Sequence, residues 1–195
     1  MLHPSLLLFS LVSLMSLSAC GGGSSDTEPA TLPAVSTNTA SASSASTHAQ
    51  IDTNCGLPNF QADLLKRINA LRAAGATCGQ RGKFPAAAEL KWQVKLANAA
   101  AVHSIDMVTK HYFSHTGSDQ LTAGERISAA GYAWTVWAEN IATGQTSVDQ
   151  VMNDWIASDG HCANLMQANV TEVGVACVRD DSKQPYWTMN LARPG

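Results

Sequence analysis

Residues 147–178, SVDQVMNDWIASDGHCANLMQANVTEVGVACV, change from a helical pattern to a strand pattern. In the first part, apolar side chains recur every three or four residues: Val148, Val151, Met152, Trp155 and Ile156. This spacing places them on one face of a helix, which we predict from about residue 147 to residue 157. Residues 173–178 are apolar, and half of them are the β-branched residue Val, so they predict a strand.

The same periodicities extend the assignment along the rest of the chain. Apolar positions at helical spacing predict helices over residues 60–74, 90–110 and 122–130, and Gly75 and Gly131 supply C-terminal stops for two of them. A second strand is predicted over residues 186–191, joined to the first by a hairpin turn at residues 180–183. Because the helices come first and the strands late, we expect an α+β domain in which helices pack on an antiparallel sheet.

The N-terminus carries a pattern typical of export. Residues 6–17 form an apolar run of the length of a signal-peptide core, and the run ends in Leu17-Ser18-Ala19-Cys20. Small residues before a cysteine resemble a lipobox, so we interpret residues 1–20 as a signal peptide and Cys20 as a lipidation site. An ordinary secretory peptide cut nearby is the alternative. We expect a protein of the cell envelope that is lipid-anchored to a membrane or secreted.

Residues 21–54 differ in composition from the rest of the chain. They are rich in Ser, Thr, Ala and Pro and have almost no large apolar side chain. Such a segment cannot bury enough surface to offset the entropy of ordering it, so we predict a disordered linker. The folded domain is predicted over residues 55–195.

The charge distribution excludes one class of partner. Charged residues make up 14% of the chain, with twelve basic residues against fifteen acidic ones, and the sequence has no run of Lys or Arg. A nucleic-acid-binding protein needs a basic patch, so we expect no nucleic acid as a partner. We expect a monomer.

The cysteines fit an exported domain. Apart from Cys20 the chain has four of them, at positions 55, 78, 162 and 177. An even number in an exported chain predicts two disulfides, for which three connectivities exist. A zinc site formed by these four cysteines is disfavoured, because Cys-x-x-Cys is absent from the sequence.

Three histidines lie close together in sequence. His103, His111 and His115 are separated by eight and four residues, with Met107 between the first two. On one continuous helix these side chains would share a face, and His111 and His115 could form a metal-binding pair. Residues 112–117, YFSHTG, instead favour a helix end near Tyr112, so we interpret His103 and His111 as helix-face residues.

Two carboxylates and one further histidine are the remaining candidates. Glu139 is surrounded by apolar residues, and a carboxylate in such a stretch usually has a partner. Glu125, which lies between Gly124 and Arg126, is a second candidate, although in most chains it would be a solvated surface carboxylate. His161 is placed in a turn after the predicted fourth helix, and turns on a rigid scaffold are common functional positions.

Several enzyme classes leave no signature in the chain. Gly-x-Ser-x-Gly, His-Glu-x-x-His, a phosphate-binding glycine loop and a dinucleotide fingerprint are all absent from the sequence. Cys162 adjoins His161, but we expect it to be in a disulfide.

A series of short stretches resembles the CAP superfamily, which groups cysteine-rich secretory proteins, antigen 5 and pathogenesis-related 1 proteins, and in particular its bacterial SCP-like extracellular branch. These stretches cover nearly all of residues 58–192. They are Leu65-x-x-Ile68-Asn69-x-x-Arg72, Leu90-x-Trp92, Ala100-x-x-His103-Ser104-x-Asp106-Met107, Tyr112-Phe113-Ser114-His115-Thr116-Gly117, Arg126-Ile127-x-x-Ala130-Gly131-Tyr132, Glu139-Asn140-Ile141-Ala142, Trp155-x-x-Ser158-x-Gly160-His161-x-x-Asn164, Gly174-Val175-Ala176 and Tyr186-Trp187-Thr188.

The resemblance implies an α-β-α sandwich with a central cleft that carries two His and two Glu. His115, Glu139 and His161 match three of these groups, and His115 and His161 are the implied ligands of zinc or another divalent cation, which the sequence does not require. The fourth group departs from the pattern, because Ser158 stands where many eukaryotic members have Glu. Asp159 or Glu125 is the substitute that the sequence offers.

Comparison with the family pattern gives one further departure and one implied set of disulfide pairs. Ala138 replaces the usual Gly before the cleft glutamate. In the bacterial branch a Cys-Gly after the first helix accompanies Gly-His-Cys, which implies the pair Cys78–Cys162 and leaves Cys55–Cys177.

Three functions from different classes fit these residues. The first is an exported binding module whose cleft takes a lipid, a glycan or a protein partner. The alternatives are a metal-dependent hydrolase of unknown substrate and a structural protein of the cell envelope. Fold alone does not decide between them.

Overall fold

The computed structural model describes residues 51–195. The predicted signal peptide, Cys20 and linker residues 21–50 lie outside the described residues. At the end of the predicted linker, Cys177 donates its main-chain N–H to the carbonyl of Thr53, and Asn54 forms a bridge with Cys177, so pairing with the domain begins before residue 55. No helix in residues 51–195 combines the length and the hydropathy that crossing a bilayer requires.

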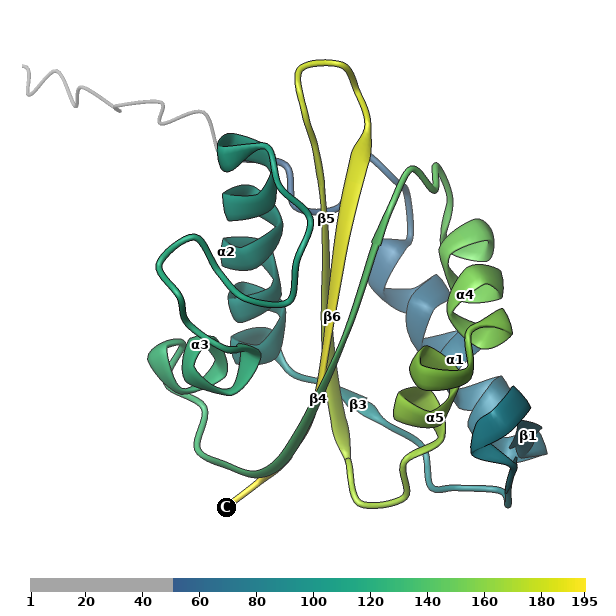
Figure 1. Cartoon of the computed structure of the whole chain (residues 1–195). Coiled ribbons are helices and arrows are strands. Elements are labelled where there is room, and N and C mark those ends of the chain that lie inside the picture. The colour runs from purple at the N-terminus through teal and green to yellow at the C-terminus, as the bar shows by residue number, and fades with distance from the viewer. Residues whose placement is uncertain (1–50) are drawn as a thin grey trace, which may run out of the picture. The chain divides into compact units, whose positions relative to one another are not determined.

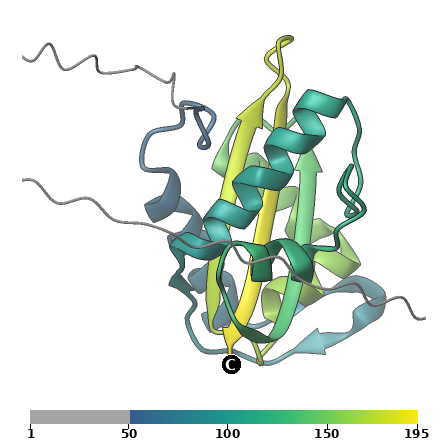
Figure 2. The same ribbon diagram turned by 90° about the vertical axis from the view of Figure 1, so that its left-hand side faces the viewer.

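The domain has three layers, with a sheet between two layers of helices (Figure 1). The sheet strands, in spatial order, are β3 (Lys91–Trp92), β5 (Glu172–Arg179), β6 (Pro185–Pro194) and β4 (Trp134–Thr143). One helical layer holds α2 (Val94–Lys110) and α3 (Ala123–Ala129), which Figure 2 shows over the same face of the sheet. The other layer holds α1 (Phe60–Ala74), α4 (Val148–Ala157) and α5 (Asp159–Met166). The predicted α-β-α sandwich is confirmed.

A small element lies outside the three layers. Strands β1 (Ala76–Thr77) and β2 (Lys83–Phe84) form an antiparallel hairpin around the short 3₁₀ helix η1 (Gly79–Arg81).

Strands β5 and β6 pair antiparallel, as the sequence predicts, β4 joins them antiparallel to β6, and the short strand β3 is parallel to β5. Gln93 at the end of β3 donates its main-chain N–H to the carbonyl of Val173 at 2.9 Å. This pairing covers the start of the β5 edge, which would otherwise leave main-chain groups open. The sheet is therefore mixed at one edge.

The local pattern places helices α1 to α4 and strands β5 and β6, and it misses two longer elements and the short elements β1, η1, β2 and β3. Helix α1 has the predicted bounds, whereas α2 begins at residue 94 because residues 91–92 pair in the sheet. Strand β4 and helix α5 were not predicted. Residues 159–162, interpreted as a turn, form the start of α5, so His161 lies on a helix. This helix depends on tertiary packing, because its apolar face is only Cys162, Leu165 and Met166.

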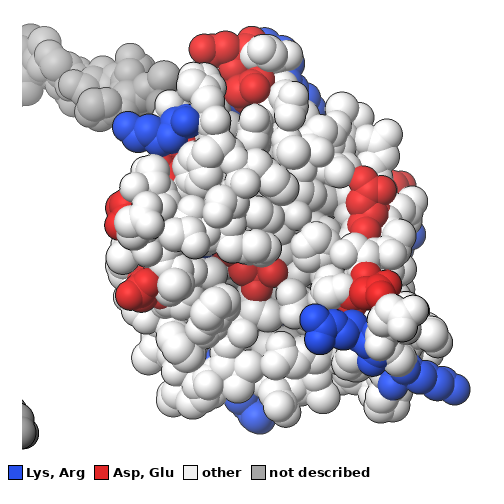
Figure 3. Space-filling view, viewed as in Figure 1, with Lys and Arg blue, Asp and Glu red and all other residues white. Residues whose placement is uncertain are grey.

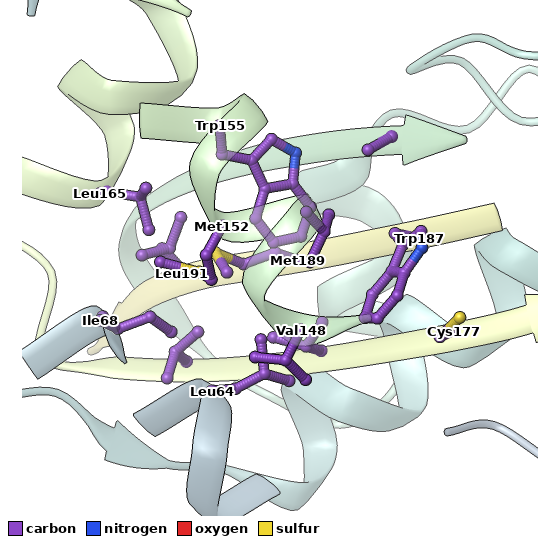
Figure 4. Packing of buried hydrophobic residues seen from close by; sticks show 14 of the residues in the cluster. Leu64, Ile68, Val148, Met152, Trp155, Leu165, Cys177, Trp187, Met189 and Leu191 are labelled. Atoms are coloured by element: carbon purple, nitrogen blue, oxygen red, sulfur yellow. The ribbon is translucent and has the colours of Figure 1, made fainter. Parts of the chain in front are cut away.

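The main core lies between the sheet and the layer of α1, α4 and α5. Figure 4 shows its central side chains: Leu64, Ile68, Val148, Met152, Trp155, Leu165, Cys177, Trp187, Met189 and Leu191. The alternate residues of β6 face α2, where Thr188 accepts a hydrogen bond from Ser104 at 2.9 Å. On this face Gly174 allows α2 to approach β5, because a Cβ there would lie 2.1 Å from the main-chain nitrogen of Ala97.

Two disulfides connect distant segments of the domain. Cys55 is joined to Cys177, which ties the start of the domain to β5. Cys78 is joined to Cys162, which ties the η1 segment to α5. Both pairs implied by the family resemblance are therefore present.

Candidate functional site

Glu139 lies in the middle of β4, an edge strand of the sheet (Figure 1). Its neighbours Ala138 and Ala142 belong to the main core, so the alternation of the strand directs Glu139 toward the opposite helical layer. The side chain of Glu139 is only 1% exposed. A buried carboxylate needs partners, as its apolar sequence context predicts.

The partners are Arg126 and His115. Arg126 Nη2 lies 2.7 Å from one oxygen of Glu139, and His115 Nδ1 lies 2.7 Å from the other. The Arg126 side chain is itself only 4% exposed, whereas that of His115 is 57% exposed. The three residues form a continuous chain of charge-assisted hydrogen bonds from the interior to the surface.

Arg126 also fixes the loop that carries His115. It donates hydrogen bonds to the carbonyl oxygens of Leu121, at 2.7 Å, and of His115, at 3.0 Å. Arg126 occupies the buried face of α3, whose N-terminus is closed by a capping box between Thr122 and Glu125. Arg126 was not predicted as a site residue, and the only signal in the sequence was a single Arg beside small and apolar residues on a short helix.

Glu125, one of the two proposed substitutes for the fourth cleft group, forms the N-terminal capping box of α3. Its carboxylate accepts hydrogen bonds from the main chain and hydroxyl of Thr122, which hold the pKa of this carboxyl below its ordinary value. Asp159, the other proposed substitute, accepts a hydrogen bond from the main-chain N–H of Gln80 at 2.8 Å. Both carboxylates therefore have hydrogen-bond partners other than His115 and Arg126.

Helix α2 holds the other end of the His115 loop. His103 is fully buried, and its Nε2 donates to the carbonyl of Ser114 at 2.8 Å. Burial lowers the pKa of His103. Asp106 accepts hydrogen bonds from Tyr112 and from both the main chain and the hydroxyl of Ser118. These contacts connect α2 to both ends of the loop.

The interpretation of the three neighbouring histidines agrees with this geometry. Helix α2 ends at Lys110, and His111 follows with φ at 54° in the left-handed region. His111 and His115 are therefore not one turn apart on a helix. His111 is exposed, His103 anchors a loop, and only His115 reaches Glu139.

His161 lies across β4 from His115, on helix α5. Burial lowers the pKa of the His161 imidazole, and the nearby His115 lowers it further. The carbonyl of His161 accepts a hydrogen bond from Asn140 at 3.1 Å. One turn later, Asn164 donates to the carbonyl of Glu139 at 3.2 Å and to the side-chain oxygen of Asn140 at 2.8 Å. Two asparagines that were not predicted as site residues thus dock α5 against β4.

A cavity of about 490 Å³ opens over Glu139, between the His115 loop with the start of α3 and the end of α5. Its lining residues are His115, Thr116, Thr122, Ala123, Trp137, Ala138, Glu139, Asn164 and Gln167. A larger hollow of about 920 Å³ lies elsewhere, by the start of the domain, α1 and α2. Its lining contains no His, Asp or Glu, so we assign the site to the smaller cavity.

The site residues fit a divalent cation in part. Glu139 holds Nδ1 of His115, which leaves Nε2 as the ring nitrogen available for a metal. The lowered pKa of His161 favours the neutral imidazole that metals bind. In residues 51–195, however, no three His, Cys, Asp or Glu side chains come together as a metal-binding group. Of the two histidines, only His115 is among the residues that line the cavity. The described chain thus offers two candidate imidazoles and no third ligand of these types grouped with them.

Comparison with known proteins places this geometry in a family. YkwD, an uncharacterized protein of Bacillus subtilis, is 31% identical over 96 residues, which cover 49% of this chain and 36% of that protein. Matches to the curated relatives thus span about a third of their length.

Two solved structures share the fold. An outer surface protein of Borrelia burgdorferi has a TM-score of 0.59 at 17% identity, over 69% of this chain and 92% of that one. An extracellular protein containing an SCP domain from Bacillus anthracis has a TM-score of 0.53 at 25% identity, over 70% of this chain and 44% of that one.

The matching family model spans residues 65–191, a range that contains Arg126, Glu139, His115, His161 and the helices α2 to α5. The chain belongs to the CAP family of cysteine-rich secretory proteins.

Proposed function

We propose that this chain is an exported CAP-domain protein whose cleft over β4 is a ligand-binding site, with His115 and His161 binding a divalent cation. The chain of hydrogen bonds from Arg126 through Glu139 to His115 carries this proposal. Burying an ion pair of this kind gives little stability compared with apolar residues of similar volume. Its effect on the imidazole is larger, because the carboxylate fixes both the ring orientation and the proton position of an exposed histidine.

The position of His115 favours binding over a structural role. A histidine that only supports the core would be buried, whereas the His115 side chain is 57% exposed and lines a cavity. The structural-protein alternative accounts for His103, which is buried against the Ser114 carbonyl, but not for His115.

The hydrolase alternative receives less support from these residues. Catalytic zinc sites generally use three protein ligands and keep an open position for water. In the described part of the chain, the two histidines have no third His, Cys, Asp or Glu grouped with them. Two imidazoles suit a weak, exchangeable cation that takes part in ligand binding.

Several features support export to the cell envelope. Two disulfides join segments 84 and 122 residues apart, and such bonds persist in oxidising compartments. Two structural relatives are described as an outer surface protein and an extracellular protein. With the lipobox-like stretch ending at Cys20, we propose a protein that is lipid-anchored to a membrane or secreted.

A calorimetric zinc titration of the full chain tests the proposal. We expect His115→Ala and His161→Ala each to abolish binding, and Glu139→Gln to weaken it by about 10–100-fold through the lost orientation of the imidazole. His111→Asn is the matched control, because His111 is exposed and Asn tolerates its left-handed backbone. His103 is unsuitable as a control, because it holds Ser114 beside His115.

Two results would reject the cation site. Zinc binding that survives both His115→Ala and His161→Ala would place the cation elsewhere. Loss of binding in the His111→Asn variant would show that the histidines outside the cleft supply the ligands.

A further inference from the structure

The cleft carries almost no free charge. Each oxygen of Glu139 is already paired, one with Arg126 and one with His115. The lining contains no other acidic side chain and no Lys or Arg. Figure 3 shows that the middle of the face on this side of the molecule is largely free of charged residues, apart from one acidic patch, and that most other charged residues lie toward its edges. Without a bound cation, a strongly charged ligand would find no unpaired counter-charge among the side chains of these walls.

The groups that remain free in the cleft are neutral hydrogen-bonding groups. The Asn164 amide nitrogen is held by the carbonyl of Glu139 and by Asn140, which leaves the Asn164 oxygen as an acceptor. Within the described chain, neither the Gln167 amide nor the Thr116 hydroxyl has a side-chain hydrogen-bond partner, and both line the cavity. The wall thus offers both donors and acceptors without a charge.

A fixed aromatic side chain completes the wall. Trp137 lines the cavity and is 36% exposed. It lies against Gly124 of α3, where an added Cβ would come within 2.6 Å of its ring nitrogen. Trp134 packs edge-on against it with ring centroids 6.2 Å apart, and Trp134 is itself held by hydrogen bonds to Gly124 and Ser128. The ring is therefore held in place before any ligand arrives, which reduces the entropy lost on binding.

These groups match one class of ligand. A sugar ring has a face of C–H groups that suits an indole, and a rim of hydroxyl or acetamido groups that both donate and accept hydrogen bonds. A lipid chain suits this wall less well, because only Trp137, Ala123 and Ala138 are apolar residues, whereas the other six lining side chains carry hydrogen-bonding groups. The cavity of about 490 Å³ lies within the range of ordinary ligand sites.

We infer that the cleft over β4 binds a neutral saccharide, which stacks on Trp137 and hydrogen-bonds to Asn164, Gln167 and Thr116. This inference deepens the proposed ligand-binding function and rests on the same cleft. It does not depend on the cation, because none of these four side chains is one of the proposed cation ligands.

The test is calorimetric titration of the full chain with two neutral probes, the tetramer of N-acetylglucosamine and maltotetraose. The protein is kept in a detergent without a sugar headgroup, with and without zinc. We expect one or both saccharides to bind, and Trp137→Ala to weaken that binding about tenfold, as expected for loss of an aromatic contact. Gln167→Ala should also weaken saccharide binding, because it removes the side-chain amide from the wall of the cavity. The main-chain carbonyl of residue 167, which accepts a hydrogen bond from Arg72, is kept in this variant.

Phe113→Ala is the matched control. Phe113 is an aromatic residue of the His115 loop that is 48% exposed and does not line the cavity. Its removal should leave saccharide binding unchanged, and the thermal stability of every variant is measured in parallel.

Each result bears on one of the two hypotheses. If neither saccharide binds with or without zinc, the saccharide inference is wrong, and the zinc titration still decides the proposed cation site. Binding that is unchanged in Trp137→Ala and Gln167→Ala would also overturn it, because the saccharide would then lie outside this cleft. Saccharide binding that depends on Trp137 in a chain that binds no zinc would support the inference and reject the cation site.

Discussion

Replacing Glu139 by Gln should cost more stability than any other isosteric change of a carboxylate in the described domain. The substitution keeps the shape of the side chain but removes the one carboxylate that pairs with Arg126 in residues 51–195, and the Arg126 side chain is 4% exposed. Removing one partner of a buried ion pair typically costs about 3–5 kcal/mol, because the other charge stays buried without compensation. Two carbonyl oxygens remain as acceptors for Arg126, so we expect the lower half of that range.

The assay is thermal unfolding at pH 7 under conditions that keep both disulfides intact. For a domain of this size, 1 kcal/mol corresponds to a shift of about 2–4 °C in Tm. We therefore expect Glu139→Gln to lower Tm by about 6–16 °C. Glu89→Gln is the control, because Glu89 is exposed, and a surface change of this kind should leave Tm nearly unchanged.

A double variant tests whether the lost stability comes from the buried charge of Arg126. Arg126→Met combined with Glu139→Gln removes the stranded cation, so the double variant should be more stable than Glu139→Gln alone. A Glu139→Gln protein that melts within about 2 °C of the wild type would refute the reasoning. The interior around Arg126 would then be hydrated enough to hold a cation without its carboxylate.

Three further predictions concern pH, the disulfide and the anchor. Burial lowers the pKa of His103, so the unfolded chain takes up this proton at higher pH than the folded protein does, and the free energy of unfolding should fall as the pH drops below about 6.5. Urea unfolding from pH 7.5 to pH 5 should show a weaker pH dependence of this free energy in His103→Gln than in the wild type. Equal pH dependence in the two proteins would contradict the assignment. Replacing Cys78 and Cys162 together by Ser removes a crosslink between residues 84 positions apart. In the chain-entropy model this should lower the free energy of unfolding, measured with denaturant, by about 4–5 kcal/mol. A decrease below about 1 kcal/mol would indicate a strained bond. Cys20→Ser should release the protein into the soluble fraction, and a mature N-terminus without lipid at any other residue would disprove the lipobox.

The sequence was sufficient where the signal is local. Helical spacing of apolar residues predicted α1 with its observed bounds, and the turn at 180–183 joins β5 and β6 as expected. The signal was insufficient for β4, because this edge strand carries Glu139 and Asn140 in its middle and so lacks a clean alternation. Helix α5 was hidden by Asp159-Gly160, which are typical of turns, and it is held by its disulfide and its packing on β4.

For the site, the sequence alone predicted a partner for Glu139, because a carboxylate in an apolar stretch usually has one. It also determined that the four domain cysteines form two bonds, while the spacing left three connectivities open. Only the tertiary structure decided that Arg126 and His115 are the partners of Glu139, and that Asn164 and Trp137 line the same cavity. The physical reason is that these residues come from a loop, two helices and an edge strand, and their proximity depends on how the two helical layers pack on either side of β4.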